Sequence, residues 1–206
     1  NPEKFDDLEN KKKLGLEGKK TLMFLGTPRA HKGTEDLFSL LDKIQTPNVQ
    51  LAVIGTQSFP FGKTETPNTL KERVTFLPKI PFSELGIYLS AADAIIIPQR
   101  HSMATVGQMP AKVYDAMAMA KPIVSTNVSD IPETIGDCGY LVEPGNVEQL
   151  AQAVDSIFSN PKKSREMGKK ARERCKKLYD MKNLKNTLLS LIEETIAKKG
   201  KKEKIS

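Results

Sequence analysis

The 206-residue sequence contains no tryptophan, only two cysteines and two histidines, and no apolar run long enough to cross a lipid bilayer. The absence of such a run argues against a membrane-spanning protein. Cys138 and Cys175 are far apart and match no metal-binding or redox spacing, which favours a reducing, cytoplasmic environment. Because aromatic residues make up only 6% of the chain, its core must be built mainly from Leu, Ile, Val, Ala and Met.

The chain is basic, with a net charge of +7, and the excess is concentrated toward its C-terminal end. Residues 162–204 hold sixteen of the 32 lysines and arginines but only six acidic residues. This pattern is typical of a solvated helix face followed by a frayed tail. The alternative is attraction to an anionic membrane surface, which would make a cytoplasmic protein peripheral to the membrane. Nucleic-acid binding is not indicated, because no aromatic interleaving or nucleic-acid motif accompanies the charges.

Short apolar runs alternate with helical patterns along most of the chain. The runs at residues 94–98 and 123–126 are too apolar for half-exposed strands and suit parallel strands covered on both faces. The alternation predicts an α/β fold, a Rossmann-like, doubly wound parallel sheet of about six strands flanked by helices. The expected strands are 19–26, 49–55, 73–77, 94–98, 123–126 and 139–142, and the expected helices are 34–44, 83–91, 110–120, 130–135, 147–159, 162–179 and 182–198.

The loop after the first expected strand suits an anion. The strand ends at Gly26 and a helix begins just past Gly33, so the helix N-terminus would offer unpaired backbone N–H groups. Arg29 and Lys32 add cations, and together these features suit a phosphate or diphosphate. The spacing is that of neither a P-loop nor GxGxxG, and such a loop with a lysine is common in α/β proteins. No functional role is assigned to His31 from the sequence.

A second group of candidate residues lies at the start of the third predicted helix, at 110–120. Pro110 suits the first helical position, so the N–H groups around Met109 and Ala111 would face the site. Lys112 and Asp115 would then lie in the first turns, on neighbouring faces. An acidic group there can accept two hydrogen bonds from a vicinal diol such as a ribose, or it can simply complement the helix dipole. Residue chemistry leaves both interpretations open.

Several long segments resemble one family of enzymes. They are VTFLPKIPFSELGIYLSAADAIIIPQR, then KVYDAMAMAKPIVSTNVSDIPETIGDCGYLVEPGNVEQLAQAV, with FLGTPRAHKG before them and MGKKARERCKKLYD after them. In order and spacing they resemble the C-terminal, donor nucleotide-sugar-binding half of retaining glycosyltransferases of the GT-B fold, family 4 (group 1). The resemblance covers nearly the whole chain.

The resemblance implies a domain organisation and an activity. Residues 1–18, of which the first ten are expected to have no fold of their own, would be a linker from a missing N-terminal acceptor domain. Residues 19–199 would form the nucleotide-sugar-binding domain, and residues 200–206 a disordered basic tail. The whole enzyme would be a hexosyltransferase of polysaccharide or glycolipid biosynthesis that uses a UDP- or GDP-sugar with retention, without cofactor or metal. The fragment alone would have little or no activity.

Residue by residue, the resemblance implies roles in donor binding. Lys32, with Gly33, matches the lysine that contacts the diphosphate, while Thr27 stands where the family usually has an arginine that Arg29 is expected to replace. Asp115 matches the second acid of a pair, the one that binds ribose hydroxyls. The predicted catalytic residues are Lys32, Arg29 and Asp115, and the predicted donor-binding residues are Gly26, Thr27, Gly33, Lys79, Ile80, Gln108, Met109, Ala111, Lys112 and Asp115.

The first acid of the family's pair is missing, because Gly107 occupies its position. In the family that acid touches the donor sugar, so the identity of the sugar stays open. Pro110-Ala111-Lys112 fits a subgroup in which this acid is often lacking. Two alternatives remain: a degenerate GT-B domain acting as a protein-interaction or membrane-surface module, and a nucleotide-sugar epimerase-like relative. The second is disfavoured, because only Asp115 and Glu133 could supply its acid–base chemistry.

Overall fold

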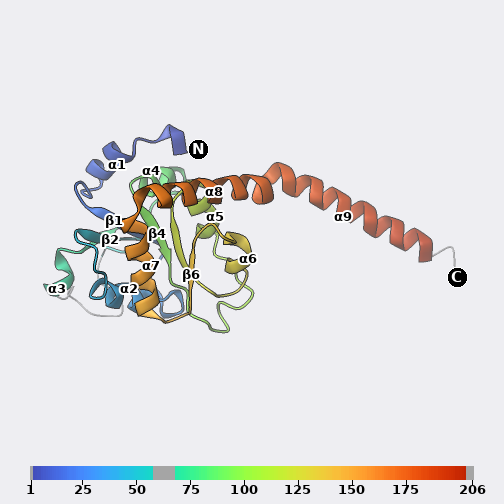
Figure 1. Cartoon of the computed structure of the whole chain (residues 1–206). Helices are drawn as coiled ribbons and strands as arrows, with labels where there is room; N and C mark the ends of the chain where they lie inside the picture. Colours follow the sequence, from blue (N-terminus) through green and yellow to red (C-terminus); the bar gives the residue numbers. More distant parts are fainter. Residues whose placement is uncertain (1, 58–67, 203–206) are drawn as a thin grey trace.

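The centre of the fold is a parallel sheet whose strand order is β3-β2-β1-β4-β5-β6 (Figure 1). The structure, a computed structural model, describes residues 2–57 and 68–202. Every strand pair is parallel, and the order reverses between β1 and β4, as in a doubly wound sheet. The predicted fold class and its strand-forming runs are thus confirmed. The strands are β1 (Lys20–Leu25), β2 (Val49–Ile54), β3 (Val74–Leu77), β4 (Ala94–Ile97), β5 (Ile123–Thr126) and β6 (Tyr140–Val142).

Helices cover both faces of the sheet because successive strand residues point to opposite faces. On one face, Leu22 and Phe24 of β1 pack into a core with α2 and α7. On the other, Met23 and Leu25 join a core that includes residues of α4, α5, α6 and α8. The helices are α1 (Asp7–Lys13), α2 (Thr34–Leu41), α3 (Asn68–Lys71), α4 (Leu85–Ser90), α5 (Lys112–Ala118), α6 (Ile131–Ile135), α7 (Val147–Ser159), α8 (Pro161–Tyr179) and α9 (Met181–Lys202), with 3-10 turns at Pro2–Lys4, Ala30–Lys32 and Phe82–Glu84.

The prediction that the first ten residues have no fold of their own was wrong. The Asp6 carboxylate caps α1 by accepting hydrogen bonds from the backbone N–H groups of Leu8 and Glu9, at 3.0 and 2.9 Å. The buried Asn10 amide donates to the Ser90 hydroxyl at 2.8 Å, and Leu16 is fully buried in the second core. The N-terminal segment therefore packs on the domain. Its role as a linker to another domain stays a prediction.

Neither α2 nor α4 begins with a side-chain cap. At the start of α2 the cap position is Gly33, in a left-handed conformation with φ 65°. The Thr34 hydroxyl instead closes the preceding loop, because it accepts from the Arg29 N–H and donates to the Arg29 carbonyl, both at 3.0 Å. Ser83 lies within a 3-10 turn, so α4 begins only at Leu85. The Pro-, Gly- and Thr-rich sequence at 57–68 predicts a loop or short hairpin; residues 58–67 of it lie outside the described residues, and Asn68 already begins α3.

The C-terminal helices differ in what they contact. Helix α8 crosses α5 closely: a Cβ on Gly168 would lie 2.0 Å from the Ala120 carbonyl oxygen, and Arg172 donates to the Ala118 carbonyl. Helix α9 projects away from the rest of the domain (Figure 1). It runs to Lys202, so residues 200–202 of the expected disordered tail are helical, and residues 203–206 lie outside the described part. None of the helices in that part is long and apolar enough to cross a membrane.

Candidate functional site

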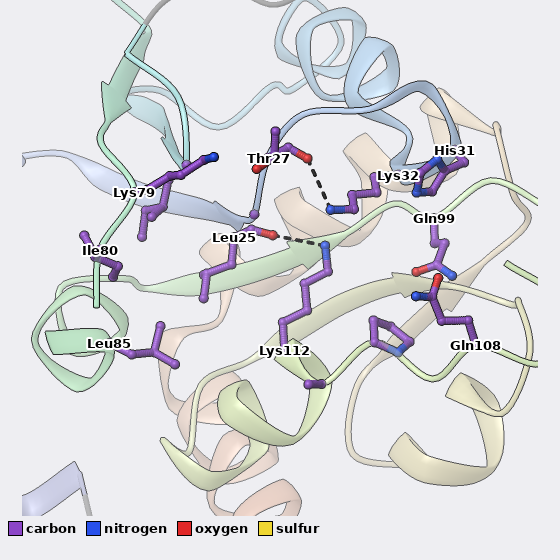
Figure 2. A pocket seen from close by; sticks show the side chains of 15 residues that line it. Leu25, Thr27, His31, Lys32, Lys79, Ile80, Leu85, Gln99, Gln108 and Lys112 are labelled. Carbon is purple, nitrogen blue, oxygen red and sulfur yellow. Dashed lines mark hydrogen bonds between the residues drawn. The ribbon is translucent and has the colours of Figure 1, made fainter. Parts of the chain in front are cut away.

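A cleft of about 470 Å³ opens at the carboxyl edge of the sheet, beside the point where the strand order reverses (Figure 2). This is where open α/β sheets bind ligands. Its walls come from the ends of β1 and β2, the loop after β3, and the segment that leads into α5. The structure thus brings together most of the predicted donor-binding residues. Those that line the cleft are Gly26, Thr27, Lys32, Lys79, Ile80, Gln108, Ala111 and Lys112.

The loop after β1 presents Lys32 to the cleft. The Lys32 Nζ donates a hydrogen bond to the Thr27 carbonyl at 3.2 Å, and burial together with the nearby Arg29 charge lowers its pKa. Gly33 lies behind this loop: a Cβ there would come within 1.8 Å of the Pro98 carbonyl oxygen. Neither Gly33 nor the exposed Arg29 lines the cleft, although both were predicted to contact the donor. Gly33 therefore shapes the loop through its backbone.

The second cation of the cleft is Lys112, the first residue of α5. Its Nζ donates to the Leu25 carbonyl at 3.1 Å and lies 4.5 Å from the centre of the Phe24 ring. Burial, with a smaller contribution from the charge of Lys32, lowers the pKa of Lys112 to about 7. Figure 2 shows both ammonium groups directed toward the end of β1. An anion between them would favour the charged form of each.

The start of α5 differs from the prediction. Pro110 lies two residues before the helix, whose N-cap position is Ala111, so Pro110 does not occupy the first helical position. Met109 packs against the second core and accepts a weak hydrogen bond from the Thr134 hydroxyl at 3.8 Å. The half-buried Asp115 carboxyl does not line the cleft, and burial raises its pKa. The proposed contact between Asp115 and a ribose therefore stays a prediction.

The position of the missing acid is open to solvent. Gly107 has φ +76°, and a Cβ built on it meets no atom within 4 Å. A side chain there would be sterically unopposed but would require a left-handed backbone. Glu133, in α6, is not among the residues that line the cleft, and its backbone carbonyl accepts a hydrogen bond from Arg174 at 2.7 Å. Among the described residues, no group of three or more His, Cys, Asp or Glu is placed to hold a metal ion.

Sequence reasoning missed several residues that line the cleft. His31 is one of them, and its pKa is lowered by burial first and then by the neighbouring charges of Lys32, Arg29 and Lys112. Gln99 is another, in the position directly after the Pro98 that follows β4. Its place at the carboxyl end of a predicted strand is a weak signal, because every residue that follows such a strand shares it. The others are Leu25, Ile54, Gly55 and Leu85.

An ion pair holds the loop that carries Gln99. Arg100 Nε donates to Asp36 Oδ2 at 2.6 Å, and a second guanidinium nitrogen bonds the other carboxylate oxygen. The Arg100 backbone N–H also donates to the His31 carbonyl at 2.9 Å. Asp36 belongs to α2 and is only 2% exposed. The loops after β1 and β4 are thereby fixed to each other and to α2.

Comparison with known proteins identifies the family of this chain. The family model described as Glycosyl transferases group 1 matches residues 6–174. Spore coat protein SA of Bacillus subtilis is 28% identical over 203 residues, 90% of this chain and 52% of that protein. N-acetyl-alpha-D-glucosaminyl L-malate synthase of Bacillus anthracis is 28% identical over 177 residues, 82% of this chain and 44% of that protein.

Solved structures support the same assignment. Sucrose-phosphate synthase of Thermosynechococcus elongatus has a TM-score of 0.75 and 25% identity, over 92% of this chain and 49% of its own. Anabaena HepE in complex with UDP-glucose has a TM-score of 0.75 at 18% identity, over 91% and 52%, and supports the fold. This chain spans about half the length of these relatives. The resemblance stated from the sequence is confirmed, and the chain belongs to the group 1 glycosyltransferase family.

Proposed function

We propose that this chain is the donor-binding half of a glycosyltransferase that takes a hexose from a UDP- or GDP-sugar. The observation that carries the proposal is the pair of partly desolvated lysines, Lys32 and Lys112, in a cleft at the carboxyl edge of the sheet. A nucleoside diphosphate is an anion of matching charge. The structures of Anabaena HepE in complex with UDP and with UDP-glucose support a uridine nucleotide as the first to test.

The two lysines would act on the leaving group. When the bond between the sugar C1 and the β-phosphate oxygen breaks, its electron pair stays on the diphosphate. The acceptor oxygen forms the new bond to C1, and the proton of the acceptor hydroxyl passes to the departing phosphate oxygen. The cations nearest this oxygen lower the barrier because the negative charge on it grows in the transition state. Lys32 and Lys112 would supply this stabilisation without a metal ion. Retention of the anomeric configuration belongs to the same proposal.

The remainder of the donor would extend along the cleft. Figure 2 shows Lys79, Ile80 and Leu85 at the end of the site opposite His31 and Gln99. We place the nucleobase at the first end, against the apolar Ile80 and Leu85. Asp115 stays our proposed ribose ligand, with a small movement at the start of α5 needed for its carboxylate to reach the cleft. The acceptor would be held mainly by the missing N-terminal domain.

The test is calorimetric titration of this chain with UDP, GDP and ADP, with Mg²⁺ and with EDTA. We expect saturable binding of UDP or GDP that is unchanged by EDTA and is weakened at least about tenfold by Lys32→Ala, the loss of one charge-assisted hydrogen bond. Asp115→Ala should weaken it by a similar factor. The matched control is Lys170→Ala, which removes an exposed lysine of α8. Absence of binding by all three nucleotides would contradict the proposal and favour the interaction-module alternative.

A sugar-transfer assay tests whether the acceptor site lies on another domain. Because the acceptor site would lie on another domain, we expect the isolated chain to transfer no sugar to glycan or lipid acceptors, even from a donor that it binds. Efficient transfer by this chain alone would overturn that part of the proposal. Location in the cytoplasm and attachment to an anionic membrane stay predictions, which cosedimentation with phosphatidylglycerol vesicles at low and high salt would check.

A further inference from the structure

The side chain of Gln99 is buried at the edge of the cleft and has an unused hydrogen-bond donor. The residue is only 4% exposed and lines the cleft. Its backbone is fixed, because the Thr126 hydroxyl donates to the Gln99 carbonyl at 2.6 Å. Within the described residues, the Gln99 Nε2 has no hydrogen-bond partner. A buried amide donor without a partner is unfavourable for folding, so it calls for an explanation.

The other buried polar atoms without a partner are elsewhere. They belong to Thr21, Gln50 and Ser129, none of which lines the cleft. Gln99 is therefore the one residue of this group, among those described, whose free donor could be satisfied by a ligand in the cleft. A ligand that supplies the missing acceptor would compensate on binding for the free energy that folding loses.

A second amide lies opposite Gln99. Gln108, on the exposed segment before α5, also lines the cleft, and Figure 2 shows the two side-chain amides directed toward each other. The cationic groups of Lys32 and Lys112 lie nearer the end of β1, where each donates to a backbone carbonyl of the Leu25–Thr27 segment. The cleft is thus divided into a cationic part and a neutral part that can both donate and accept hydrogen bonds.

This division matches the parts of a nucleotide sugar. The diphosphate oxygens only accept hydrogen bonds and carry charge, so they suit the lysines. Sugar hydroxyls both donate and accept and are neutral, so they suit primary amides.

We propose that Gln99 Nε2 donates a hydrogen bond to a hydroxyl of the donor sugar, with Gln108 contacting the same sugar, so that these two amides determine sugar specificity. The inference rests on the proposed function.

The test compares a nucleotide with and without its sugar. Calorimetry would measure the affinity of the chain for UDP, UDP-glucose and UDP-N-acetylglucosamine, and for GDP and GDP-mannose. In the wild type we expect at least one nucleotide sugar to bind more tightly than its parent nucleotide. Gln99→Met keeps the side-chain length but removes the hydrogen-bond donor. It should reduce the affinity for that nucleotide sugar by up to about tenfold, the effect of one hydrogen bond. Binding of the parent nucleotide should stay within about twofold.

Two further variants keep the result interpretable. Gln50→Met is the matched control, because it makes the same change at a buried glutamine of β2 outside the cleft, and it should alter neither affinity. Gln108→Met changes an exposed residue, so it tests the amide pair even if Gln99→Met does not fold. We expect it to reduce affinity for the sugar selectively. We expect the melting temperature of Gln99→Met to equal or exceed that of the wild type, because the unpartnered donor is removed.

The results distinguish a failure of the proposed role of the two amides from a failure of the proposed function itself. If the wild type binds UDP or GDP but the sugar adds no affinity, or if both cleft variants weaken nucleotide and nucleotide sugar equally, the role of the amides is refuted while the proposed function stands. If the wild type binds none of these nucleotides, the proposed function fails and the inference fails with it. Selective loss of the sugar contribution in Gln99→Met or Gln108→Met supports the proposal.

Discussion

We expect Lys112 to make the proposed nucleotide binding depend on pH in a range where the ligand itself no longer titrates. Burial, with the charge of Lys32 as a smaller cause, lowers the pKa of Lys112 to about 7 in the empty cleft. The protonated fraction then falls from about one half at pH 7 to about 1% at pH 9. A terminal phosphate loses its last proton near pH 6, so a nucleoside diphosphate keeps a constant charge across this range.

The magnitude follows from this fraction. If a bound diphosphate keeps the Lys112 ammonium protonated up to pH 9, apparent affinity falls by about fiftyfold between pH 7 and pH 9. Binding at pH 8 takes up about 0.9 protons from the buffer. The pKa of His31 is lowered from 6.5, chiefly by burial, so in the empty cleft its imidazole is mainly neutral above pH 7. The pKa of Lys32 is also lowered, chiefly by burial. The variant Lys32→Ala measures how much Lys32 contributes to the pH dependence of the affinity.

The assay is calorimetry of UDP or GDP binding at pH 7, 8 and 9 in two buffers of different ionisation enthalpy, which counts protons directly. Lys112→Met preserves the length of the side chain without its charge, so it should bind more weakly at pH 7 and show little dependence on pH. Lys170→Ala should behave as the wild type. An affinity that is flat from pH 7 to 9 in the wild type would refute the reasoning. The same slope in Lys112→Met would refute it too.

The same lysine affects folding with a sign that can be worked out. Its pKa in the folded chain, about 7, lies below the ordinary 10.5, so between these values the unfolded chain binds more protons. The free energy of unfolding therefore rises with pH across this window, by about 1.4 kcal/mol per pH unit from this group. We expect the difference in stability between Lys112→Met and the wild type to be largest near pH 7 and to shrink toward pH 10. Urea denaturation of both proteins at pH 7, 8.5 and 10 checks this, and a constant difference would contradict it.

Two further predictions concern the loops that form the cleft. Gly33→Ala should cost at least about 2 kcal/mol of unfolding free energy, because φ is 65° and the added Cβ would meet the Pro98 carbonyl oxygen at 1.8 Å. Gly107→Ala, with φ +76° but no neighbour, should cost about 1 kcal/mol, and equal urea midpoints would refute the comparison. Arg100→Met should cost about 3 kcal/mol because it leaves the buried Asp36 carboxylate unpaired, and Asp36→Asn in the same chain should restore part of it; no rescue in thermal melts would count against the pairing.

The strands could be predicted closely because their short runs are so apolar that they must be buried on both faces of a sheet. Residues 94–98 and 123–126 were expected as buried parallel strands, and the structure has β4 at Ala94–Ile97 and β5 at Ile123–Thr126. The Asp6 cap of α1 is a local signal that was missed, but the hydrogen bond from Asn10 to Ser90, eighty residues away, which ties the helix to the domain, could not be predicted from the sequence. Local pattern carries no information about such a partner.

The residues of the cleft, too, could be predicted from the sequence only in part. The loop with Thr27 and Lys32 was predicted because glycine, cation and helix start are local signals, and the structure places both residues in the cleft. Asp115 was assigned from spacing and resemblance, yet α5 begins two residues later than expected and its carboxylate does not line the empty cleft. Gln99 was missed because a glutamine after a strand has no distinctive spacing. Its importance depends on burial and on an amide without a partner, which only the three-dimensional structure reveals.

The arrangement of charge in the cleft has a consequence for how specificity could change. Every nucleoside diphosphate carries the same anionic group, so in the proposed site Lys32 and Lys112 would hold any of them but would not distinguish the sugars attached. The amides of Gln99 and Gln108 carry no net charge, so they would discriminate between sugars only by hydrogen-bond geometry. Substitution of an amide should therefore change which sugar is preferred while nucleotide affinity is kept. Substitution of a lysine should weaken all donors by the same factor, and a lysine variant that reordered the sugars would show that the two parts are coupled.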